Sequence, residues 1–189
     1  MKIKKYIKKA KKKSPRLFST AKFILKFNLL AIPMYIVLLL RMEIQQLKDI
    51  TAGIVFFVLQ STGIDVAMLP NNLISIPISG GSWAAFIDWD CTGWKSMYAL
   101  FALIFATNFS ARKKFYGLLL LPLVYIINIA RIWFMFFYVS NYGLAYFSIV
   151  HAFVWSWGLI AVILILWVLW IRWALGNKFI LIKSKGNRQ

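Results

Sequence analysis

Acidic residues are scarce in this 189-residue chain, which holds 5 Asp and Glu against 23 Lys and Arg. Cysteine and histidine occur once each, as Cys91 and His151. A single cysteine excludes a disulfide within the chain. One Cys and one His cannot build a zinc site without carboxylate ligands, which are few here. We therefore expect no metal site and no cofactor.

Apolar residues, in contrast, are abundant. They make up 61% of the chain, and the mean hydropathy is +0.73. Soluble globular domains contain roughly 45–50% apolar residues, and a water-soluble core of this size could not bury the excess. The composition predicts an integral membrane protein.

The basic residues are grouped beside the apolar segments. Nine of the 23 lie in residues 1–16, and others form Arg112-Lys113-Lys114 and the tail after Arg172. Positive charge in such flanks marks the cytoplasmic side and contacts anionic lipid. This placement favours a membrane surface and argues against a nucleic acid partner.

The predicted fold class is an all-α polytopic membrane protein with about five to six transmembrane or membrane-embedded helices. Crossing a bilayer takes about 20 apolar residues. The predicted segments are 17–40, 49–69, 91–110, 115–138 and 145–172. Proline, asparagine and glycine in 70–90 predict an ordered outer loop before the third span, with room for short strands.

Four regions follow from this division of the chain. They are a basic arm of the cytoplasmic type (1–16), an N-terminal membrane segment (17–48), a membrane-embedded core (49–172), which the site residues described below would make the catalytic core, and a basic tail (173–189).

Orientation follows from the basic residues, but it leaves one conflict. If Arg112-Lys113-Lys114 and the tail are cytoplasmic, the 70–90 loop faces outward and the second span runs outward. A full crossing by 17–40 would then place the basic arm outside. Either this segment lies in the interface or re-enters around Pro33, or the arm breaks the rule, or the second segment is interrupted.

Three polar residues share one predicted depth near the outer surface. Arg131 lies about 10 Å and His151 about 9 Å from the outer ends of their spans, at 1.5 Å per residue. Cys91 lies where the outer loop becomes the third span. Taken singly, they could be a snorkelling arginine, a packed imidazole and an inert small residue. Ionisable groups inside a membrane are nevertheless rare and costly, and their common depth indicates a site.

The chemistry of the three side chains is coherent. A helix N-terminus at Cys91 would favour the thiolate, and His151 could accept the thiol proton. Arg131 could stabilise an oxyanion or a carboxylate. Asp88 and Asp90 would oppose thiolate formation; we expect them to face substrate, to cap a helix or to pair with Lys95.

These residues also form a pattern that resembles the exosortase/archaeosortase family. The pattern consists of Asp90-Cys91-Thr92-Gly93, Asn128-Ile129-Ala130-Arg131-Ile132 and His151, within roughly 49–172. The short chain is similar to the compact archaeal-type members. The resemblance implies a membrane-embedded cysteine transpeptidase with Cys91 as nucleophile, Arg131 as electrostatic partner and His151 as third basic residue.

The resemblance also implies the partners. The substrates would be precursor proteins that end in a short motif, a hydrophobic helix and a basic tail. Their new carboxyl group would pass to a membrane lipid or another acceptor. We expect a multi-pass protein of the plasma membrane with an extracytoplasmic active site. The candidate substrate-binding or supporting residues are Asp90, Thr92, Gly93, Lys95, Asn128 and Trp155.

Two other functions fit parts of the sequence. A small transporter or channel subunit could line an anion or proton path with Arg131 and His151, and Cys91 would then be dispensable. A scaffold for other membrane proteins could use the aromatic-rich last two spans, including Trp155 and Trp157, as its contact surface.

Overall fold

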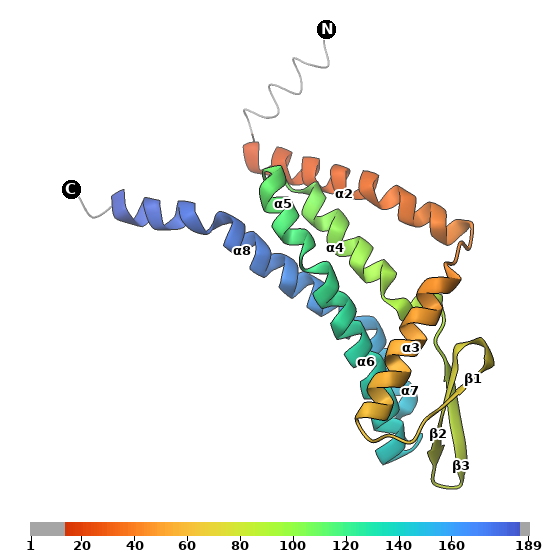
Figure 1. The fold of residues 1–189 in the computed structure, drawn as a ribbon. Helices are drawn as coiled ribbons and strands as arrows, with labels where there is room; N and C mark the ends of the chain where they lie inside the picture. The colour runs from red at the N-terminus through yellow and green to blue at the C-terminus, as the bar shows by residue number, and fades with distance from the viewer. Residues whose placement is uncertain (1–13, 186–189) are drawn as a thin grey trace.

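Long helices lying side by side dominate the fold (Figure 1). The computed structural model describes residues 14–185, apart from the side chains of 154–156 and 177–185. Among the described residues, three helical segments are long and apolar enough to cross a membrane: Pro15–Leu39, Ala111–Tyr142 and Leu159–Gly176. Helix α4 (Trp94–Ala106) is apolar but has 13 residues. The predicted count of five to six spans is not confirmed.

Helix α2 (Pro15–Leu39) bears on the conflict over orientation. Its 25 residues are long enough to cross, and it packs along α4. Near the middle of α2, Lys26 Nζ donates a 2.8 Å hydrogen bond to Asn108 Oδ1, in the link between α4 and α5. The start of α2 lies at the same end of the bundle as Arg112-Lys113-Lys114 (Figure 1). With α2 crossing, the charge rule places both basic segments on one side.

The predicted second span, 49–69, is not one continuous helix, and it is interrupted after Ser61, as one of the alternatives allowed. Helix α3 (Gln45–Ser61) ends early, and a strand follows it. The buried side chains of α3 pack against strand β2 and helix α6 rather than facing lipid. The hydroxyl groups of Thr51 and Tyr125 are hydrogen-bonded at 3.1 Å across this contact. The apolar run that resembled a span therefore includes a core-facing side, with Val55 and Leu59, and exposed residues such as Phe57.

The predicted ordered loop, 70–90, contains two strands of a three-stranded antiparallel sheet whose first strand lies just before it, so the fold is mostly helical but not all-α. Its strands, in the order β1-β2-β3, are Ala67–Leu69, Leu73–Ile78 and Gly81–Phe86. In β2, Ile74 and Ile76 are buried against the helices, as alternation in a strand requires. Ile76 pairs with Trp83 of β3, which sets the register beside the site.

The predicted span 115–138 begins earlier and is interrupted. Helix α5 (Ala111–Leu118) leads into α6 (Leu121–Tyr142). The break precedes Pro122, which has no N–H to donate to the preceding turn. Near this break, a Cβ on Gly117 would lie 2.9 Å from the Trp170 ring, so only glycine fits here.

The predicted span 145–172 is divided into three parts. Helix α7 (Phe147–Ala152) is followed by a π-helical segment (Phe153–Gly158) and then by α8 (Leu159–Lys185). At the start of α7, Tyr138 Oη donates a 2.7 Å hydrogen bond to the Ala145 carbonyl and closes the turn after α6.

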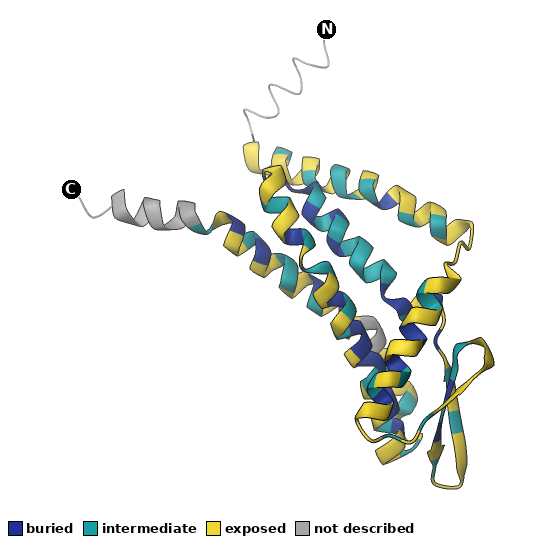
Figure 2. Cartoon of the chain, viewed as in Figure 1, coloured by how far each residue is buried: buried dark blue, intermediate teal, exposed yellow. Residues whose placement is uncertain are grey.

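Buried residues, dark blue along the ribbon in Figure 2, form two clusters. One joins α4, α6 and α8 through Leu100, Ile104, Val124, Ile163 and Trp170. The other joins α3, β2 and the far half of α6, and includes Val55, Leu59, Ile74, Ile76 and Phe136. Helix α6 belongs to both clusters. It connects the membrane bundle to the compact end that carries the sheet.

Candidate active site

The cysteine lies in a short, fully capped turn. The 3₁₀ helix η2 (Trp89–Thr92) begins after Asp88, whose carboxylate accepts a 2.7 Å hydrogen bond from the Trp89 N–H. Thr92 is buried, and its hydroxyl donates to the Trp89 carbonyl at 2.8 Å. Gly93, at φ +75°, then starts α4. Cys91 therefore precedes the first turn of α4 rather than forming part of it.

Cys91, Arg131 and His151 line one cavity of about 80 Å³. They come from η2, α6 and α7, and are separated by 40 and 20 positions in the sequence. The other described residues of the lining are apolar: Trp83, Ala85, Phe86, Ile87, Ile132, Met135, Phe136 and Phe147. Three ionisable groups thus meet in a small cavity with an apolar wall.

Aromatic contacts set the position of His151. Trp83 of β3 makes edge contacts with Phe136 of α6 and with Phe147 of α7, each at 5.3 Å between ring centroids. Phe147 in turn stacks on the His151 ring at 5.4 Å. The sheet therefore holds α7 against α6, which explains why a loop far from His151 in sequence forms part of its surroundings.

Asn128 of α6 holds the turn that carries Cys91 in place. It is completely buried, and its Nδ2 donates a 2.8 Å hydrogen bond to the Cys91 carbonyl. A Cβ on Gly93 would lie 2.8 Å from the Asn128 side chain, so the turn approaches α6 as closely as glycine allows. These contacts give Asn128 and Gly93 a positioning role at this site.

The environment of Cys91 favours the neutral thiol. Burial raises its pKa, and the nearby carboxylates of Asp88 and Asp90 act in the same direction. A hydrogen bond to the backbone at Asp88 and the charge of Arg131 lower it, but the net direction is upward. The sulfur also donates to the Phe86 carbonyl at 3.8 Å. The expectation of a helix terminus that favours the thiolate is therefore wrong, and the thiol needs a base.

His151 is suited to be that base. Its ring lies outside the helical segments that are long enough to cross the membrane. Partial burial lowers its pKa, and the positive charge of Arg131 lowers it further. Imidazole is consequently neutral at pH 7 and able to accept a proton. Arg131 is 9% exposed, and its charge acts on both Cys91 and His151.

The two acids beside Cys91 have separate structural roles. Asp88 caps η2, and Asp90 forms a 2.7 Å ion pair with Lys95, one turn further along. Both roles were among those expected from the sequence. Asp90, Lys95 and Arg131 also line a second cavity, of about 300 Å³, on the side of α8.

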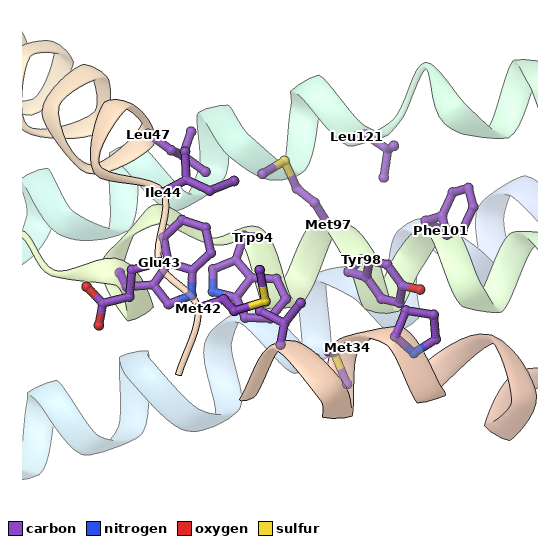
Figure 3. Close-up of a pocket in the computed structure, with 13 residues that line it drawn as sticks. Met34, Met42, Glu43, Ile44, Leu47, Trp94, Met97, Tyr98, Phe101 and Leu121 are labelled. Carbon is purple, nitrogen blue, oxygen red and sulfur yellow. The ribbon is translucent and has the colours of Figure 1, made fainter. Parts of the chain in front are cut away.

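A larger apolar groove lies on the other side of η2. It has a volume of about 550 Å³ and is lined by α2, the link to α3, and α4. Figure 3 shows Trp94, Met97, Tyr98 and Phe101 along α4, with Met34 and Met42 opposite. Neither Cys91 nor Arg131 nor His151 lines this groove, so size alone does not locate the site.

Some of the predicted site residues do not line either of the two cavities beside Arg131. Some residues that line these cavities were not predicted from the sequence. Thr92 supports η2 but lines neither of the two cavities. The side chain of Trp155 lies outside the described part of the chain. Sequence reasoning missed Trp83, Phe147 and Ser96. Only Phe147 carried a usable signal, because it precedes His151 by one helical turn.

Comparison with known proteins identifies the family of the chain. The transmembrane exosortase family matches residues 13–171, most of the chain, and the chain belongs to that family. Membership indicates a membrane transpeptidase that acts on sorting signals, and the match extends over α2 as well as the predicted core. No curated protein and no solved structure matches the chain significantly.

Proposed function

We propose that this exosortase-family protein is a thiol transpeptidase that cleaves a C-terminal sorting signal and transfers the new carboxyl group to an acceptor. The observation that carries the proposal is the shared cavity of Cys91, Arg131 and His151. The only thiol and the only imidazole of the chain meet there beside a buried guanidinium. A nucleophile, a base and an electrostatic stabiliser are the groups that acyl transfer requires.

In the first half-reaction, His151 takes the thiol proton as Cys91 Sγ attacks the scissile carbonyl carbon. Arg131 stabilises the oxyanion of the tetrahedral intermediate. Collapse of the intermediate breaks the carbon–nitrogen bond, and His151 returns the proton to the leaving amine. The product is a thioester on Cys91, while the hydrophobic helix and basic tail leave as the amine fragment.

In the second half-reaction, an acceptor nucleophile attacks the thioester carbonyl. His151 takes the acceptor's proton, and Arg131 again stabilises the oxyanion. The carbon–sulfur bond breaks, and the sulfur recovers a proton from His151. The apolar wall around the thiol limits access of water, which would hydrolyse the thioester. The substrates are precursors with a short motif, a hydrophobic helix and a basic tail, and the site faces the extracytoplasmic side.

Co-expression with such a precursor from the same genome tests the proposal. The wild-type protein should shorten the precursor, whereas Cys91→Ala and Cys91→Ser should leave it full length at equal membrane levels. A transporter or channel subunit would not need the thiol. Full processing by Cys91→Ala would therefore reject covalent catalysis and favour that alternative.

A further inference from the structure

The second cavity opens where α4 and α8 separate. The two helices pack together through Leu100 and Ile163. One turn closer to Cys91, Ser96 and Leu159 instead line a space of about 300 Å³. Among the described residues, the lining consists of Asp90, Gly93, Lys95, Ser96, Arg131, Leu159 and Ile160.

Arg131 forms part of the wall of both cavities. The thiol and the imidazole lie on one side of it, in a space of about 80 Å³. Ligand pockets measure roughly 300–1,000 Å³, so the thiol cavity is small for a second substrate whereas the cavity beside α8 is large enough. A group bound there would reach the guanidinium that stabilises the reacting carbonyl.

The charges of this second cavity indicate the chemistry of its ligand. Lys95 and Arg131 are positive and Asp90 is negative, so the wall has an excess of positive charge. The Asp90–Lys95 ion pair, at 2.7 Å, is partly exposed and can rearrange around a ligand. A phosphate would meet the two cations. An amine or hydroxyl group next to that phosphate in the same ligand could approach the Asp90 carboxylate.

The position of the cavity indicates where such a ligand comes from. Ile160 lines it and is 52% exposed. The same residue belongs to the apolar segment Leu159–Gly176, which is long enough to cross the membrane. A lipid lying along α8 could therefore place its head group in the cavity while its chains remain beside the helix.

We infer that the cavity between α4 and α8 receives the head group of the acceptor, a lipid that carries an amine or hydroxyl next to a phosphate. This inference rests on the proposed function. The nitrogen or oxygen of the head group attacks the thioester carbonyl past Arg131, and an amide or ester bond forms. The carbon–sulfur bond breaks, and the proton of the nucleophile passes through His151 to the Cys91 sulfur.

The second half-reaction can be tested without a sorting signal. The full-length protein is placed in vesicles of phosphatidylethanolamine or phosphatidylglycerol, or in phosphatidylcholine as a lipid without a nucleophile. Cys91, the only thiol, is acylated by exchange with N-acetylglycyl benzyl thioester. Mass spectrometry then measures the ratio of acylated lipid to free N-acetylglycine. Parallel samples receive hydroxylamine, a small nucleophile that needs no head-group site, or soluble phosphoethanolamine.

Two variants change the cavity in different ways. Ser96→Phe fills it, and Met97→Phe is the matched control, because Met97 faces the apolar groove on the other side of α4. Lys95→Met keeps a long side chain but removes a positive charge. Ser96→Phe and Lys95→Met should each lower the transfer ratio about tenfold or more, since contacts to the non-reacting part of a substrate contribute to the rate. Release by hydroxylamine should fall much less than transfer to lipid in both variants, and Met97→Phe should resemble the wild type.

The outcomes separate the inference from the proposed function. Equal transfer ratios in the wild type and Lys95→Met would overturn the inference, even if Ser96→Phe failed to fold. The inference would also be overturned if the acylated wild-type protein gave only free N-acetylglycine, and no acylated lipid, in both phosphatidylethanolamine and phosphatidylglycerol vesicles. More efficient transfer to soluble phosphoethanolamine than to lipid would overturn it as well. Precursor processing by Cys91→Ala would instead reject the proposed function itself.

Discussion

The Asn128 side chain donates a 2.8 Å hydrogen bond to the Cys91 carbonyl, so helix α6 holds the cysteine turn directly. Asn128 precedes Arg131 by three residues, and side chains at that spacing lie on one face of a helix. One face of α6 thus positions both the turn that carries the thiol and the guanidinium that acts on it. Small shifts at such contacts lower reaction rates strongly.

Asn128→Leu should reduce precursor processing by at least about tenfold and destabilise the protein by about 1–3 kcal/mol, because a buried carbonyl loses its donor. Processing is followed by immunoblot, and stability by thermal unfolding in detergent. Asn141→Leu is the matched control. Asn141 lies on the same helix, is exposed, and donates only to the Phe137 carbonyl within α6. Equal effects of the two substitutions would contradict a specific role for Asn128.

Arg131→Lys should be severely impaired although it keeps the positive charge. A lysine lacks the planar, paired donors of guanidinium, and its ammonium group is more strongly hydrated. Arg131→Ala should cleave the sorting signal more slowly still than Arg131→Lys, because it also loses the positive charge. The initial rate of signal cleavage in one lipid background checks both variants. Near-wild-type cleavage by Arg131→Lys would show that charge alone is sufficient.

The raised thiol pKa predicts slow alkylation of Cys91 at neutral pH. Because the pKa lies above its ordinary value, the reactive thiolate is a minor species at pH 7, and its fraction grows as the pH rises. The iodoacetamide rate, measured by intact mass, should therefore still be rising above about pH 8.5. Asp90→Asn should increase the rate at pH 7, since a carboxylate that opposes thiolate formation is removed. A rate that is already at its plateau by pH 7 would contradict this electrostatic description.

The protonation state of His151 should determine how the rate of precursor processing changes at low pH. Its pKa is lowered, so the basic form persists below the ordinary value of about 6.5, and activity should fall only under more acidic conditions. His151→Ala should lower the rate about 10²–10⁴-fold at pH 7. Partial recovery towards pH 9 is expected as the thiol ionises unaided. High activity in His151→Gln would instead assign this residue an orienting role.

The sequence singled out the candidate site residues more readily than it showed the architecture around them. Cys91 and His151 were conspicuous because each occurs once, and Arg131 because it interrupts an apolar segment. Hydropathy did not show that α3 buries Val55 and Leu59 against the sheet and α6. An apolar run looks the same whether lipid or protein covers it, which is why 49–69 resembled a span.

The fine structure of the site depends on contacts between distant segments. Nothing near Asn128 in the sequence indicates that its amide meets the Cys91 carbonyl, and Trp83 reaches His151 only through Phe147. The pKa of the Cys91 thiol likewise depends on contacts that the sequence does not show. A helix terminus after Cys91 was visible in the sequence, whereas the burial that outweighs it was not.

The most direct test of the central claim is the intact mass of the protein during turnover. Precursor and wild-type protein are mixed in acceptor-free phosphatidylcholine vesicles, stopped with acid at short times and analysed by mass spectrometry. We predict an adduct with the mass of the cleaved precursor, attached at Cys91, that neutral hydroxylamine releases and that Cys91→Ala never forms. Cleavage of the precursor by wild-type protein without any hydroxylamine-sensitive adduct, together with unchanged cleavage by Cys91→Ala, would contradict the account.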